Sequence, residues 1–234
     1  MKWLFEPPKN YPEMLKKIAY TMFFAVIIGM VILTNYLQSF SEFIKSISFG
    51  MQIEAYNIKI YIADLYIPLF FAILENVFEF HDKVSDLFKI RYKFDKFVII
   101  KNFLDQLNMP NKIKNVNKNN RKAIMDEIFY KYAGYDKPSI DIHLIYMALH
   151  SWSWYWIIID TMIVAVITGI LMLLINFSAI GLFTFVAILF VLFILSCSVK
   201  SQCKKYALRE VNTILKLNNG LSQKRICRYL EDAL

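Results

Sequence analysis

Carboxylate side chains occur inside an apolar part of the sequence at intervals that place them on one side of a helix. Asp64, Glu75 and Asp82 are separated by 11 and 7 residues, and at about 100° per residue these intervals return to nearly the same direction. Ionisable groups inside a bilayer are costly and are therefore candidates for function. A line of carboxylates facing a shared axis in an oligomer would attract cations, as rings of carboxylates do in cation channels. The predicted ion path consists of Asp64, Pro68, Glu75, Glu79, Asp82 and Asp160.

Asp160 lies in a separate apolar stretch, at nearly the same predicted depth as Glu75. Two carboxylates at one level could share a proton or coordinate an ion. Two plainer interpretations stay open: neighbouring helices satisfy the carboxylates by hydrogen bonds, or Glu75, Glu79 and Asp82 lie near enough to the interface to reach water. If the line conducts ions, replacing Asp64 by Asn or Glu75 by Gln should abolish flux and leave assembly intact.

Four apolar stretches are long enough to hold these side chains in a bilayer. Each has about 20 residues, enough for a helix to cross a hydrocarbon core roughly 30 Å thick. The chain has 234 residues, of which 57% are hydrophobic, and this composition fits a membrane bundle with a modest cytoplasmic part. The predicted fold is all-α: a four-span transmembrane helix bundle, a small helical cytoplasmic domain between spans two and three, and a helical cytoplasmic C-terminal tail.

The predicted organisation has five parts. Between the first two spans, Phe40, Phe43, Ile44 and Ile47 have the spacing of a short amphipathic helix. The parts are a cytoplasmic N-terminal segment (1–17), transmembrane hairpin 1 (18–78, with spans 18–37 and 58–78), a cytoplasmic helical domain (79–153), transmembrane hairpin 2 (154–199, with spans 154–175 and 180–199) and a basic cytoplasmic tail (200–234).

The distribution of positive charge predicts the topology. Of 27 Lys and Arg residues, only Lys45 and Lys59 fall outside the first 17 residues, segment 79–150 and the tail after Val199. An even number of spans puts those three regions on one side, and positively charged loops favour the cytoplasm. Frequent Lys, Ile and Asn suggest an A+T-rich bacterial genome. The predicted location is therefore the bacterial inner membrane, with both termini cytoplasmic.

The basic side chains of the predicted cytoplasmic domain are candidates for binding an anionic partner. Their plainer interpretation is that they fix the topology and contact anionic lipid headgroups. The expected partners are the lipid bilayer, further copies of this chain and a soluble cytoplasmic protein, with a nucleic acid or nucleotide as a further candidate. The predicted binding residues are Lys89, Arg91, Lys93, Lys96, Lys112, Lys114, Lys118, Arg121 and Lys122.

The sequence lacks the familiar catalytic and metal-binding motifs. It has no Gly-rich phosphate loop, paired-His zinc motif or nucleophile elbow. His81-Asp82 is a weak match to metal-dependent phosphohydrolases, and His143 and His150 are spaced as in a packing stripe. The three cysteines suit neither a zinc site nor a disulfide framework. We therefore expect no enzyme activity, no cofactor and no bound metal.

The layout is similar to that of small multi-pass membrane effectors of prokaryotic antiviral systems, in which a cytoplasmic sensing part controls a membrane-permeabilising bundle. This similarity is one of architecture alone. The first hypothesis is a homo-oligomeric membrane effector or channel-like subunit in prokaryotic antiviral defence, controlled through its basic cytoplasmic domain by a partner or anionic signal. The alternative is a non-conducting anchor or scaffold that recruits a soluble cytoplasmic partner. A proton- or ion-coupled transporter that uses Asp64 and Asp160 is a third possibility.

Overall fold

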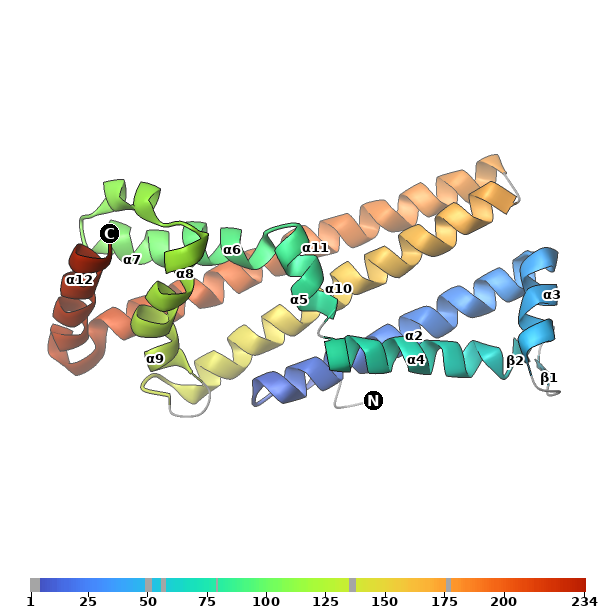
Figure 1. The fold of residues 1–234 in the computed structure, drawn as a ribbon, viewed down its shortest axis with the longest axis horizontal. Helices are drawn as coiled ribbons and strands as arrows, with labels where there is room; N and C mark the ends of the chain where they lie inside the picture. The colour runs from blue at the N-terminus through green and yellow to red at the C-terminus, as the bar shows by residue number, and fades with distance from the viewer. Residues whose placement is uncertain (1–4, 49–51, 56–57, 79, 135–137, 176–177) are drawn as a thin grey trace. The chain divides into compact units, whose positions relative to one another are not determined.

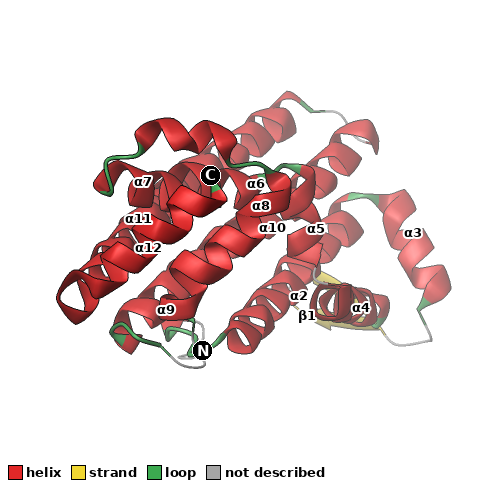
Figure 2. Cartoon of the chain, turned by 60° about the vertical axis from the view of Figure 1, so that its left-hand side comes forward, coloured by secondary structure: helices red, strands yellow, loops and turns green. Residues whose placement is uncertain are grey.

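The computed structural model describes residues 5–48, 52–55, 58–78, 80–134, 138–175 and 178–234. These residues are almost entirely helical, apart from one short β-hairpin (Figure 2). The chain divides into two compact units. The apolar unit comprises Leu15–His81 and Ser153–Val199, and the polar unit comprises Met1–Met14, Asp82–Trp152 and Lys200–Leu234.

The first half of the apolar unit is a helical hairpin closed at one end by a short helix and two strands (Figure 1). Its elements are α2 (Tyr11–Tyr36), α3 (Gln38–Ile47), β1 (Gln52–Ala55), β2 (Ile58–Tyr61) and α4 (Ala63–Phe78). The strands pair antiparallel, with Gln52 opposite Tyr61. Ile44 of α3 is completely buried against Met30, Tyr61 and Ala63, which confirms the amphipathic helix predicted there.

The second half of the apolar unit contains parts of two long helices, α10 (Ile142–Ile175) and α11 (Ala179–Lys216). They lie side by side (Figure 1), and Gly169 is a point of close approach, because a Cβ atom there would lie 2.2 Å from the Phe185 ring. Gly29 serves the packing of α2 against α10 in the same way, since a Cβ atom there would lie 2.8 Å from Thr168 Oγ1. Small residues at such crossings are typical of membrane helices.

Three helical stretches in the described part of the chain are long and apolar enough to cross a membrane: Tyr11–Tyr36, Ile142–Ile175 and the run Ala179–Ala233 that contains α11. None of the most apolar part of α11 is buried. Those exposed apolar side chains require an apolar environment. The chain thus has the character of a membrane protein.

The second predicted span (58–78) differs in the structure. Residues Ile58–Tyr61 form strand β2, and α4 has 16 residues, so it is about 24 Å long, less than the roughly 30 Å hydrocarbon core. The β-branched Ile58 and Ile60 favour the strand, and the Asp64 carboxylate accepts the Tyr61 backbone N–H, which fixes the change from strand to helix. The described chain therefore has three helices of spanning length, and α4 is a shorter apolar helix.

The polar unit is built from short helices around an apolar core. Its core includes Phe103, Ile124, Ile128, Ile214 and Leu230, each at most 1% exposed. Two segments are π-helical, η1 (Asp95–Ile100) and η3 (Asp126–Tyr130). The other elements are α5 (Phe80–Leu87, which begins in the apolar unit), α6 (Ile90–Phe94), α7 (Lys101–Gln106), η2 (Pro110–Asn115), α8 (Lys118–Met125), α9 (Lys131–Ala133), η4 (Leu217–Gly220) and α12 (Leu221–Ala233).

Candidate functional site: a buried carboxylate pair

Asp160 of α10 is buried in the apolar unit without a hydrogen-bond partner. Its side chain is 2% exposed, and neither carboxylate oxygen has a partner among the residues that the structure describes. Glu75 of α4 is 3% exposed and has an unpartnered Oε2 within the same described ranges. His81, which contacts Glu75, also packs against Trp156, one helical turn before Asp160 on α10. The two carboxylates that the sequence placed at one depth thus lie beside the same pair of side chains.

His81 binds the other oxygen of Glu75. Its backbone N–H donates to Oε1 at 3.2 Å, and its Nδ1 lies 3.1 Å from the same oxygen. The imidazole is buried against Trp156, with ring centroids 5.8 Å apart in an edge-to-face arrangement. Because the contacted carboxyl oxygen of Glu75 acts as an acceptor, we assign a proton to His81 Nδ1, which donates to Oε1.

Glu75 and His81 lie on two different helices, α4 and α5. In a continuous α-helix, residues six apart are about 9 Å apart along the axis and point in different directions. Here α4 ends at Phe78 and α5 begins at Phe80, so the His81 N–H can reach the Glu75 side chain. The sequence pattern predicted one helix through this region. A continuous helix would not bring His81 to the Glu75 carboxylate, so this contact was not predicted.

The residues of the predicted line of carboxylates lie on more than one helix in the structure, whereas the prediction placed Asp64, Glu75 and Asp82 on a single helix. Asp82 is in the first turn of α5 and lies 3.9 Å from Arg91 in the polar unit. Asp64 is fully buried and hydrogen-bonded, and Pro68 is buried inside α4. Glu79 lies outside the described residues.

The described side chains around Glu75 and Asp160 do not form a recognisable metal-binding site. Within the described ranges, no group of three or more His, Cys, Asp or Glu side chains is arranged to hold a metal.

The nine predicted anion-binding residues divide into two groups. Four hold the polar unit together: Arg121 pairs with the buried Asp95, Arg91 donates to the Tyr130 hydroxyl at 3.3 Å, Lys96 donates to the Val116 carbonyl and Lys112 donates to the Glu231 carbonyl at 2.9 Å. The side chains of the others are exposed: Lys89, Lys93, Lys114, Lys118 and Lys122. These five remain available to a partner.

Two buried acids of the polar unit were not predicted. Asp95 begins the first π-helix, and burial raises the pKa of its carboxyl to about 6, although Arg121 and Arg91 oppose the shift. Glu210 of α11 is 5% exposed, and burial raises its pKa to about 8. Asp95 is followed by Lys96, and Glu210 follows Arg209. Charged neighbours are typical of exposed positions, so the sequence pattern did not indicate that either acid is buried.

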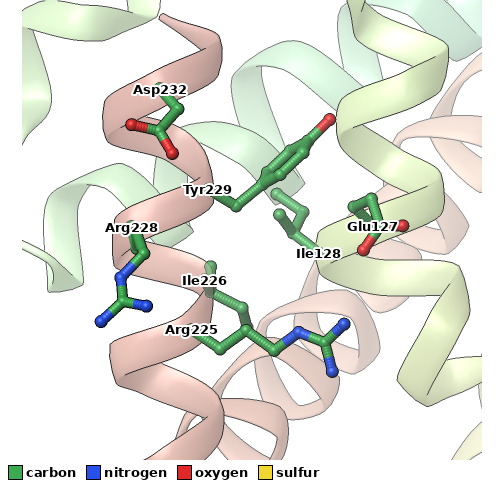
Figure 3. A pocket seen from close by; sticks show the side chains of 7 residues that line it. All are labelled: Glu127, Ile128, Arg225, Ile226, Arg228, Tyr229 and Asp232. Atoms are coloured by element: carbon green, nitrogen blue, oxygen red, sulfur yellow. The ribbon is translucent and has the colours of Figure 1, made fainter.

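A small cavity of about 240 Å³ lies between η3 and α12 (Figure 3). Its walls carry charges of both signs, and burial together with Glu127 and Asp126 raises the pKa of Tyr229. No sequence motif pointed to it. The lining residues are Glu127, Ile128, Arg225, Ile226, Arg228, Tyr229 and Asp232.

Comparison with known proteins places the chain in a family. The model of the YmfE protein family matches residues 10–225. The chain belongs to the YmfE protein family. It is also similar to an uncharacterized protein, YmfE, of Escherichia coli (strain K12), with 25% identity over 184 residues that cover 72% of this chain and 71% of the relative. No solved structure matches the chain.

The YmfE match covers both units and the candidate site. Residues 10–225 include Glu75, His81 and Asp160, the three helices of spanning length as far as Arg225, and the core of the polar unit. The buried carboxylate pair therefore lies within the part of the chain on which YmfE membership rests.

Proposed function

We propose that this protein is a membrane effector or channel-like subunit that lets cations cross the bilayer, and that Glu75, His81 and Asp160 form the polar site on their path. The observation behind the proposal is the burial of Asp160 without a hydrogen-bond partner in the described structure. Of the predicted ion-path residues, Glu75 and Asp160 are retained in this role, and Asp64 is assigned to structure.

Burial of an ionised carboxylate without a partner carries a cost in free energy. A buried carboxylate without a partner costs several kcal/mol when it is ionised, and polar residues kept inside membrane helices mark ion or proton pathways. A cation near Asp160 and Glu75 would offset that cost. A purely structural role for Asp160 would require a partner for its oxygens, as Asp64 has in Thr34.

The proposal includes the assembly of several copies. The apolar side chains of α11 are exposed, among them Ile180 and Phe183, at 82% and 77%, and lipid or neighbouring subunits would cover them. We propose a homo-oligomer in the bacterial inner membrane with both termini in the cytoplasm. The five exposed lysines would bind the soluble partner or anionic signal that controls it, in the manner of an antiviral effector.

The test is cation flux across vesicles that contain the purified protein. Wild type is expected to release a trapped cation, whereas Asp160→Asn and Glu75→Gln are expected to reduce release strongly. Asp105→Asn is the matched control, because Asp105 is an exposed carboxylate on α7 whose partner is Lys101, and its flux should equal that of wild type. Equal flux in Asp160→Asn and wild type would refute the proposal.

A non-conducting scaffold is the second candidate, and the mixed-charge cavity beside α12 together with the exposed lysines favours it. Vesicles that stay tight with wild-type protein, while the same protein retains a soluble partner in a pull-down, would support the scaffold. In that case, replacing Lys114, Lys118 and Lys122 by Gln should release the partner, and Asp160→Asn should not.

A further inference from the structure

We infer that the cation carried by this site is the proton, shared between Asp160 and Glu75 and held in place by His81. The inference rests on the proposed function and narrows it from cations in general to one species. It concerns a site whose side chains all come from the apolar unit.

The number of free oxygens favours a proton over a metal cation. In the described structure, the unpartnered atoms are Oδ1 and Oδ2 of Asp160 and Oε2 of Glu75. Calcium is bound by roughly six to eight oxygens, and magnesium by about six. A proton needs only two, one that bears it and one that accepts it. Three oxygens on two carboxyls are therefore enough for a proton, whereas calcium or magnesium would need further ligands from backbone or water.

His81 determines which oxygen of Glu75 takes part. Its backbone N–H and its imidazole both approach Oε1, and Trp156 limits the movement of the ring. Oε1 is therefore occupied and Oε2 is left for the proton. His81 acts as a positioning residue, because it orients Glu75 and does not have to exchange the proton itself.

Proton transfer between the two carboxyls breaks one O–H bond and forms another. In one state Asp160 bears the proton and donates it in a hydrogen bond to ionised Glu75, directly or through one water. In the other, the O–H bond of Asp160 has broken and an O–H bond has formed at Glu75 Oε2. The total charge of the pair is the same in both states, so transfer within the pair adds no second negative charge, which burial would make very costly. A net proton crosses when the pair takes up one proton from one side and releases one to the other.

The first test is infrared spectroscopy of the full-length protein in bilayers. A protonated, buried carboxylic acid gives a carbonyl stretch that ionised carboxylates lack. Because burial also raises the pKa of Glu210 to about 8, the test uses protein that carries Glu210→Gln. In this background we expect the band at neutral pH, its loss when Asp160→Asn is added and its retention when Asp105→Asn is added. Absence of the band in this background, or a band that neither Asp160→Asn nor Glu75→Gln changes, would overturn the inference.

The second test compares ions in vesicles with a trapped pH dye and with trapped sodium or potassium. We expect wild type to carry protons, with little sodium or potassium, and Asp160→Asn to carry roughly a hundredfold fewer protons. Sodium or potassium flux without proton flux would overturn this inference but leave the proposed function standing. No flux of any cation would overturn both.

His81→Phe tests the positioning role, because phenylalanine keeps the contact with Trp156 and removes the imidazole donor. The expected result is a carbonyl band that is still present but shifted in frequency, together with slower proton flux. An unshifted band with unchanged proton flux would exclude a positioning role for His81. A band shift would not arise from His81 merely filling space.

Discussion

Asp64 and Asp160 are the same residue type, both almost completely buried in the apolar unit, and their surroundings differ in one respect. Asp64 accepts the Thr34 hydroxyl at 3.1 Å and the Tyr61 backbone N–H at 2.8 Å. Asp160 has no partner for either oxygen among the described side chains and backbone groups. Burial alone therefore does not identify a functional carboxylate. What distinguishes the structural Asp64 from the candidate-site Asp160 is whether hydrogen-bond donors contact the carboxylate.

The polar unit contains a similar contrast between two buried acids, one with a partner and one without a compensating charge. Asp95 is buried next to Arg121, whereas burial raises the pKa of Glu210 with no compensating group acting against the shift. Because both of these acids belong to the polar unit, their stability effects test the distinction between partnered and unpartnered carboxylates outside the apolar unit.

The largest effect is expected from Arg121→Met, which removes the countercharge of Asp95 but keeps most of the aliphatic packing. A buried acid left without its partner typically costs 3–5 kcal/mol, so we expect a loss of about 4 kcal/mol at pH 7. The loss should shrink near pH 5, where Asp95 is protonated. Thermal unfolding in detergent measures it. Lys122→Met is the matched control, since Lys122 is exposed, and an equal effect in both variants would refute the assignment.

Glu210→Gln should raise stability, by an amount that depends on pH. The folded-state pKa is about 8 against an ordinary 4.5, so between these values the unfolded chain releases a proton that the folded chain keeps. Wild-type stability therefore falls as pH rises through this window. The advantage of Gln should be absent near pH 4 and grow to on the order of 3–4 kcal/mol by pH 8. A pH-independent difference in melting temperature would contradict this account.

Asp64→Ala is expected to destabilise the apolar unit by about 2–3 kcal/mol, because it leaves the Tyr61 N–H and the Thr34 hydroxyl buried without an acceptor. Asp64→Asn keeps one carbonyl oxygen and should lose less. The same detergent unfolding experiment applies. If Asp64→Ala unfolds at the wild-type temperature, Asp64 is not structural and the comparison with Asp160 fails.

The smallest effect is expected from Asp160→Asn, which should change the free energy of unfolding by less than about 1 kcal/mol. A neutral acid and an amide have nearly the same shape, so little is lost if Asp160 is protonated in the native protein. A gain of several kcal/mol would instead mean that the variant removes a buried charge. Unfolding curves of the two proteins at neutral pH distinguish these outcomes.

Hydropathy predicted the membrane character of the chain well, because length and composition determine it. Helices of spanning length occur at Tyr11–Tyr36, at Ile142–Ile175 and from Ala179 onward, as the apolar stretches indicated. The span starting at Ile58 was misjudged since apolar content does not distinguish a strand from a helix. The side chain that matters there is Asp64, whose hydrogen bond to Tyr61 is a tertiary feature.

The candidate site was predictable in part. Equal depth suggested that Glu75 and Asp160 could lie near each other, and in the structure His81 contacts Glu75 and packs against Trp156, one turn from Asp160. The role of His81 was not predictable, because it lies on a different helix from Glu75 and no Gly or Pro between these residues separates the two helices in the sequence. The roles of Arg91 and Arg121 were also missed, since a basic side chain that faces a buried acid has the same sequence pattern as one that faces solvent.

The measurement that tests the central claim most directly is proton flux into vesicles containing Asp160→Asn or Asp64→Asn, each normalised to folded protein. The account predicts that Asp160→Asn loses the flux and that Asp64→Asn, though less stable, retains it below its melting temperature. Loss of flux in Asp64→Asn with full flux in Asp160→Asn would contradict the account and restore the ion path along α4.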